Sequence, residues 1–369
     1  MSEYQFYEFQ AVDRHLTDQE MNELRSFSTR ADITPNRFVN EYSWGSFKGD
    51  EDLWMEKYFD EFLHYANWGT HILTLGLPAV FLDLEIAQTY CTNRNASVRL
   101  RNNRIILKFS SESEDGGEWE EGLKLSAFLG LRRDLIQGDL RCLYLGWLSG
   151  IQDEEYDEEE FEPPVPAGLA QLSPALIRFA EFLRIDPDLL EAASKVSPSL
   201  DQAAPSPEDL RIWLATLPSK ERESLLSDII EGSMKGDQTT AMSLSHRFNK
   251  MWNQRRTSQI SEAKRRVLQL LNDTKNVSQE RRRMSKLARE KQLNEMVGRE
   301  STIWDQIESL VSEKQAASYE RAVELLVDLR DLAARGDSDP FQLKFAALRK
   351  KHSGKSLFIN HCRRMEIKI

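Results

Sequence analysis

The chain has 369 residues, and its formal net charge is −11. This length exceeds what one hydrophobic core usually supports, so two or three domains are expected, and 40% hydrophobic with 9% aromatic residues excludes a wholly disordered chain. No apolar run reaches the roughly 18 residues of a membrane-spanning helix and the first residues lack a signal-peptide pattern, so we expect a cytoplasmic protein without a membrane partner.

The chain begins with a predicted strand and a well-marked helix. Residues 4–12 alternate apolar and polar side chains, as a half-buried strand does. A helix is predicted over residues 18–28, because Thr17 and Glu20 form a capping-box pattern before an apolar stripe. A second strand is predicted over residues 38–44.

A longer helix is predicted over residues 50–69, because acidic residues open it and Gly69 follows it. Its predicted buried stripe is Met55, Tyr58, Phe59, Phe62 and Ala66. A strand follows over residues 70–77, and Asn102-Asn103 predicts a tight hairpin. Because strands and helices mix without regular β-α-β alternation, we expect an α+β fold over residues 1–152, with helices covering a mixed or antiparallel sheet.

The rest of the chain predicts helices only. Acidic and proline residues over 153–168 predict a domain linker. Helix starts then recur as a capping residue followed by proline, at Ser173, Asp186, Ser206 and Asp339. The predicted order is a helical domain over 169–254, one or two long charged helices over 255–313, and helical hairpins over 314–369.

An aromatic and histidine-rich stretch is the candidate pocket, with Trp44, His64, Trp68 and His71 as its lining residues. An enzymatic site, the least favoured hypothesis, would lie there. Packing is the favoured explanation, because most aromatic residues of this stretch recur at core-facing positions. His64 and His71 are separated by a turn, so metal ligation does not follow from their spacing.

No motif indicates a cofactor or a metal. The three cysteines, Cys91, Cys142 and Cys362, are scattered, which argues against a disulfide framework and a zinc ribbon. Residues 353–356 end like a phosphate-binding loop, but Arg349 stands where such a loop begins with glycine. We therefore predict no catalytic residue, no cofactor and no metal.

The strongest signal outside the predicted core is a basic run over residues 255–291, with twelve Lys or Arg and four acidic residues. Docking on an acidic protein surface, or simple solvation, is favoured over contact with nucleic-acid phosphates, because no nucleic-acid-binding motif accompanies the run. Residues 1–162 carry a net charge of −17, so the run can also pair with the chain's own acidic half. The candidate binding residues are Arg255, Arg256, Lys264, Arg265, Arg266, Arg281, Arg282, Arg283, Lys286 and Arg289.

Several stretches together resemble a bacterial protein family whose genes often lie beside a gene for a SWIM zinc-finger protein. They are YEFQAVDRHLTDQEMNELRSFSTRADITPNRFVNEYSWG, LSPALIRFAEFLRIDPDLLEAA, EDLRIWLATLPSKERESLL and AVELLVDLRDLA. The resemblance covers most of the chain and supplies no catalytic residue. It implies membership of a bacterial multi-protein system, and a SWIM zinc-finger protein as a candidate partner.

The sequence therefore favours a non-enzymatic interaction or scaffold protein that binds a partner protein through its C-terminal helical half. The alternative is a nucleic-acid-binding component that uses the basic helix over residues 255–291.

Overall fold

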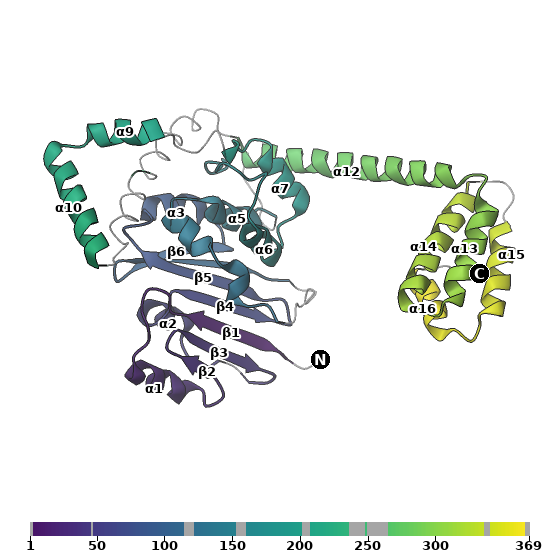
Figure 1. Ribbon diagram of the computed structural model, residues 1–369, viewed down its shortest axis with the longest axis horizontal. Helices are drawn as coiled ribbons and strands as arrows, with labels where there is room; N and C mark the ends of the chain where they lie inside the picture. Colours follow the sequence, from purple (N-terminus) through teal and green to yellow (C-terminus); the bar gives the residue numbers. More distant parts are fainter. Residues whose placement is uncertain are drawn as a thin grey trace. The chain divides into compact units, whose positions relative to one another are not determined.

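The computed structural model describes residues 3–45, 47–113, 122–152, 160–200, 207–235, 248, 265–335 and 340–365 (Figure 1). The chain divides into two compact units, which we call the N-terminal unit (Met1–Val277) and the helical unit (Ser278–Ile369). The N-terminal unit contains an antiparallel sheet with covering helices, and the described part of the helical unit is helical. The predicted α+β fold class is confirmed.

A seven-stranded antiparallel sheet lies at the centre of the N-terminal unit, in the order β2-β3-β1-β4-β5-β7-β6. Consecutive strands are not always neighbours, because β1 lies between β3 and β4. The strands are β1 (Gln5–Gln10), β2 (Asp32–Thr34), β3 (Arg37–Tyr42), β4 (Glu61–Ala66), β5 (His71–Pro78), β6 (Ala96–Arg101) and β7 (Arg104–Ser111).

The helix predicted over residues 50–69 is wrong beyond its first half. Helix α2 spans Glu51–Lys57, and strand β4 begins at Glu61. β4 pairs with β1 on one side and with β5 on the other. All the residues of the predicted stripe are nevertheless buried. Backbone pairing with two neighbouring strands therefore overrides an apolar spacing that also fits a helix.

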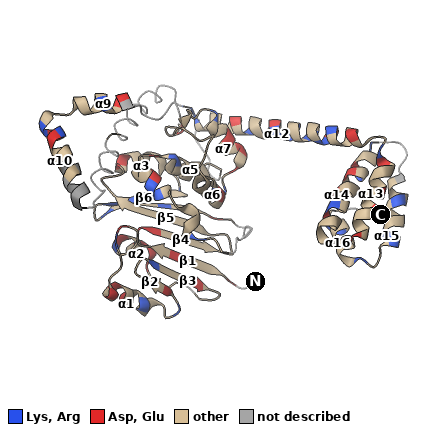
Figure 2. Ribbon diagram, in the orientation of Figure 1, with Lys and Arg blue, Asp and Glu red and all other residues tan. Residues whose placement is uncertain are grey.

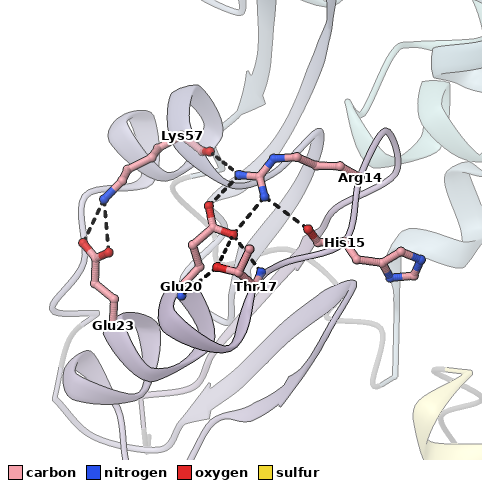
Figure 3. A network of polar contacts seen from close by, with 6 residues as sticks. All are labelled: Arg14, His15, Thr17, Glu20, Glu23 and Lys57. Carbon is pink, nitrogen blue, oxygen red and sulfur yellow. Dashed lines mark hydrogen bonds and ion pairs between the residues drawn. The ribbon is translucent and has the colours of Figure 1, made fainter.

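Helix α1 (Asp18–Phe27) begins with the predicted capping box. The Thr17 hydroxyl accepts a hydrogen bond from the Glu20 backbone, and the Glu20 carboxylate accepts one from the Thr17 backbone at 2.8 Å. Arg14 donates two more bonds to that carboxylate, at 2.7 and 2.8 Å (Figure 3). These bonds, led by those from Arg14, lower the pKa of Glu20 to about 2. Because Arg14 also donates to the Lys57 carbonyl, the network links the start of α1 to the end of α2.

Each face of the sheet carries its own hydrophobic core. Phe9 and Phe62 lie in the core covered by α1 and α2. Leu75 and Leu107 lie in the larger core of the opposite face, because side chains alternate along each strand. The elements that complete this second core are α3 (Leu84–Tyr90), the 3-10 turn η1 (Leu125–Phe128), α4 (Leu131–Ile136), α5 (Arg141–Gly150), α6 (Pro174–Phe182) and α7 (Pro187–Ser194).

The hairpin between β6 and β7 forms as predicted. Asn102 and Asn103 connect the strands with φ of 49° and 60°. Asparagine tolerates this left-handed region better than most residues do, and two successive positive φ values match the twist of an antiparallel hairpin.

The predicted linker over residues 153–168 lies partly outside the described residues. Its described end belongs to the N-terminal unit, where Glu162 and Val165 are 6% and 8% exposed. Beyond it, Ser173 and Asp186 cap α6 and α7 as predicted. Helices α6 and α7 bury apolar side chains in the larger core of the N-terminal unit. The boundary between the two compact units therefore follows Val277 and does not lie at the acidic segment.

Two further helices, α9 (Pro207–Thr216) and α10 (Ser219–Lys235), follow in the predicted helical domain. Proline opens α9 as predicted, whereas Ser206 lies outside the described residues. The Trp213 ring packs against the Phe248 ring in a tilted arrangement, with ring centroids 5.3 Å apart. Several of the apolar side chains of these helices are exposed, among them Leu226 and Ile230.

The helical unit has a separate core, to which Ile307, Leu326, Phe345 and Phe358 belong. The sequence predicts one or two charged helices over residues 255–313, and the described part of this range forms two, which Gly298 separates with φ of 79°. The helices are α12 (Val267–Met296), which begins in the N-terminal unit, α13 (Glu300–Ser312), α14 (Ala316–Ala333), α15 (Pro340–Lys351) and α16 (Ser356–Arg364). Among the described residues, no helix is both long and apolar enough to cross a membrane.

Candidate functional site

The structure separates the two histidines of the candidate pocket. Ile72 is the cross-strand partner of His64, and His71 is the partner of Tyr65. Paired residues of antiparallel strands share a face and adjacent residues alternate, so His64 and His71 lie on opposite faces of the sheet. They do not form a common site.

His71 has a structural environment. Its ring stacks on Phe182 with centroids 4.5 Å apart, and its Nδ1 lies 2.7 Å from the Phe182 carbonyl oxygen. A carbonyl only accepts, so Nδ1 carries the proton, and Nε2 then accepts from the Arg184 guanidinium at 3.2 Å. Burial, together with the Arg184 charge, lowers the pKa of His71 to about 4. The neutral imidazole thus links β5 to the end of α6.

The other three predicted lining residues are also separated: His64 lies in the core, whereas the two tryptophans lie at the surface. His64 is buried, stacks on Tyr7 at 4.2 Å and lies 3.0 Å from the Phe6 carbonyl, and burial lowers its pKa to about 4. Trp44 and Trp68 are 69% and 44% exposed, in loops at the same end of the sheet. The four predicted lining residues therefore do not enclose one pocket.

A cavity of about 310 Å³ lies beside α2, where the sequence indicated none. Tyr7 and Phe47, stacked 4.8 Å apart, form its apolar wall. Glu51 and Lys108 also line it, and burial raises the pKa of the Glu51 carboxyl. Tyr7, from β1, and Lys108, from β7, reach the same cavity across the intervening strands β4 and β5, which no local sequence pattern reveals.

The predicted basic run is only partly a surface. Arg255, Arg256 and Lys264 lie outside the described residues. Arg265 is 8% exposed on its side chain and makes two hydrogen bonds to the Glu162 carboxylate, at 2.6 and 2.8 Å. Glu162 also accepts from Tyr144, so Arg265 completes a buried polar network. Arg266 lies over the exposed Phe161 ring at 5.8 Å.

Arg289, at the other end of the run, also pairs within the fold. Its guanidinium pairs with Asp328 and, at 2.6 Å, with Asp331 of α14. Gln292 adds a bond to Asp328 at 2.8 Å. These contacts hold the C-terminal part of α12 on α14, so Arg289 contributes little free positive charge.

The middle of the basic run is exposed on every side of α12. Each side chain from Arg281 to Ala288 is exposed. Figure 2 shows charged residues along this helix. Met284 and Leu287, which are 56% and 48% exposed, lie between the basic residues. This segment therefore presents apolar and positive groups together. The predicted binding residues that it contains are Arg281, Arg282, Arg283 and Lys286, and Arg283 lies 3.8 Å from the Glu280 carboxylate.

A second basic surface lies outside the predicted run over residues 255–291. Residues 340–365, which form α15 and α16, contain seven Lys or Arg and no Asp or Glu (Figure 2). Basic residues in the last turn of a helix are stabilised by the negative end of the helix dipole, which accounts for part of this pattern. Lys344 and Lys350 are exposed, and Leu343, at 79%, is more exposed than any other described large apolar side chain. In the sequence, the absence of Asp and Glu over residues 340–365 is the pattern that indicates this surface.

Comparison of the chain with protein-family models, with curated proteins and with solved structures finds no match.

Proposed function

We propose that this chain is a non-enzymatic interaction protein that binds a partner protein through its helical unit and α12. The observation that carries the proposal is the mixture of exposed apolar and basic side chains on residues 281–288. Met284 and Leu287 lie among Arg282, Arg283 and Lys286, and all five are exposed. A protein surface can bury the apolar groups and pair the charges in one interface.

Charge indicates the kind of partner. The helical unit contains 19 Lys or Arg and 14 Asp or Glu, whereas the N-terminal unit contains 30 and 46. A positively charged unit attracts an acidic partner over distances of about the Debye length, roughly 10 Å at 0.1 M salt. The expected partner surface is therefore acidic, with apolar residues at its centre. The family resemblance makes a SWIM zinc-finger protein the first candidate.

Nucleic-acid binding through the basic run is the alternative function. Arg282, Arg283 and Lys286 favour it, because clustered cations release counterions when they contact phosphates. Arg265 and Arg289 are instead engaged inside the fold. Exposed leucine and methionine gain nothing from a phosphate backbone, so the protein partner is preferred.

Affinity capture from native cells tests the proposal with the full-length protein and with residues 1–277, which keep the core of the N-terminal unit. We expect the partner to be lost from the truncated protein. In the full-length protein, Met284→Asp with Leu287→Asp should weaken capture by on the order of tenfold, since each exposed apolar contact contributes about 1 kcal/mol.

The matched control is Leu226→Asp, which changes an exposed leucine of α10 and should leave capture unchanged. Equal recovery of the partner by the full-length and truncated proteins would show that the helical unit is not the docking surface.

A further inference from the structure

A groove between α13 and α15 lies in the helical unit, apart from the exposed segment of α12. Trp304, Ala347 and Leu348 form its apolar floor. Trp304 packs on Phe341 with ring centroids 5.7 Å apart, so the floor rests on the core of the unit. Asp305 and Glu308 line the α13 wall, and Lys344 and Lys351 line the α15 wall.

The dimensions of the groove suit a side chain. Its volume is about 230 Å³, which is below the roughly 300–1,000 Å³ of pockets that hold drug-sized ligands. The apolar surface continues onto the outside of α15, because Leu343 lies four residues before Ala347 and shares a helical face with it. Leu343 is 79% exposed on this face. A single exposed leucine is ordinary, but one beside a tryptophan-floored groove extends an apolar strip.

The α15 wall is positively charged. Lys344 lies over the Trp304 ring at 5.9 Å. Lys350 does not line the groove, but it is exposed on the outer face of α15 that carries Leu343, without an ion pair among the described residues. Lys351 pairs with Glu308 across the groove. Burial is the main cause that lowers the pKa of His352, and the charges of Lys355 and Lys351 lower it further.

We propose that the α13–α15 groove binds an acidic amphipathic helix of the partner protein, with an apolar side chain against Trp304 and Leu348 and carboxylates facing Lys344 and Lys350. This inference rests on the proposed function and specifies the partner's chemistry. Helices dock in grooves through apolar residues spaced by three and four positions. Carboxylates on the same helix pair with the exposed lysines at the rim, where they chiefly fix orientation and association rate.

The two walls also argue against nucleic acid in this groove. Asp305 and Glu308 face Lys344 and Lys351, so a phosphate backbone laid along the groove would meet like charges on the α13 side. A helix can place its acidic side on the α15 wall alone. The opposite signs of the two walls therefore give the bound helix a preferred orientation.

Fluorescence anisotropy of the full-length protein with a labelled helical peptide tests the inference. The probe carries leucines on one face and glutamates on the other. Binding should be saturable and weaken with salt, because rim charges contribute to it. Lys344→Glu with Lys350→Glu should weaken binding by on the order of tenfold, and Leu343→Asp by several-fold, since each such contact contributes about 0.5–1 kcal/mol.

Arg321→Glu is the matched control, because Arg321 is an exposed basic residue of α14 that pairs with Glu324. Circular dichroism shows whether each variant keeps its fold. No peptide binding, or binding unchanged by the groove variants, overturns the inference. Duplex DNA that competes with the peptide for the same residues would also overturn it, in favour of a phosphate-binding surface.

The two proposals fail in different ways. If the helical unit still captures a partner but the peptide does not bind, only the groove assignment fails. If the peptide binds but the truncated chain captures the partner equally well, the proposed function fails instead.

Discussion

Glu61, at the start of β4, is a buried carboxylate, 9% exposed, next to other charged groups. Burial is the main cause that raises its pKa to about 7. Arg132 lowers the pKa, whereas the nearby carboxylates of Asp60, Asp13 and Glu8 raise it further. Because the unfolded chain ionises this group near pH 4.5, native stability is lost as the pH rises from about 4.5 through 7.

Replacement of Glu61 by glutamine should therefore stabilise the protein at neutral and alkaline pH. The expected gain is up to about 3 kcal/mol above pH 7, since each pKa unit corresponds to about 1.4 kcal/mol, and it should vanish near pH 4. Urea denaturation at several pH values measures it. Glu20→Gln is the control of opposite sign, because the pKa of Glu20 is lowered and its contribution is present above pH 4.5. A gain for Glu61→Gln that does not vary with pH would contradict the assignment.

At the scale of one element, α12 combines a buried N-terminal end with a fully exposed middle segment. Val267, Leu270 and Val277 are buried at its N-terminal end, whereas every side chain from Arg281 to Ala288 is exposed. Most helical stability in proteins comes from packing of an apolar face, and isolated helices shorter than about 12–15 residues are marginal in water. The exposed segment should therefore open more readily than its two ends.

Hydrogen exchange measured residue by residue tests this expectation. Amides of residues 281–288 should exchange on the order of a hundredfold faster than those of Ala322 to Leu329 in α14, where packing adds about 3 kcal/mol or more to the cost of opening. Partner binding should slow exchange in residues 281–288. Uniform protection along α12 in the free protein would show that propensity alone holds the helix.

At the scale of the whole molecule, the two units have separate cores and should unfold in separate transitions. Phe358 is fully buried in the core of the helical unit. Phe358→Ala should destabilise that unit by about 3–5 kcal/mol, through lost burial and the cavity left behind. Calorimetry should show one transition shifted to lower temperature while the other is unchanged.

Leu107→Ala, in the core of the N-terminal unit, is the reciprocal control and should shift the other transition. A single transition that moves with either substitution would mean that the two units unfold cooperatively.

Local chemistry alone determined much of this protein. Three features depend on contacts within a few residues and were predicted correctly. Thr17 and Glu20 form the capping box of α1, and Ser173 and Pro174 begin α6. Asn102 and Asn103 form the hairpin between β6 and β7. The five residues of the predicted stripe, Met55, Tyr58, Phe59, Phe62 and Ala66, are also buried as predicted, although they do not lie in one helix.

Only the tertiary structure decided which element those residues form, and which charged residues are buried in ion pairs and which are exposed. Phe62 and Ala66 lie in a strand because β1 and β5 supply hydrogen-bonding partners from other parts of the chain. Arg265 and Arg283 belong to the same basic run, yet one is buried against Glu162 and the other is exposed. A sequence run gives the charge but not the partner that neutralises it, since Glu162 is 103 residues away. The groove between α13 and α15 arises in the same way, because its two walls come from helices that the chain brings together only on folding.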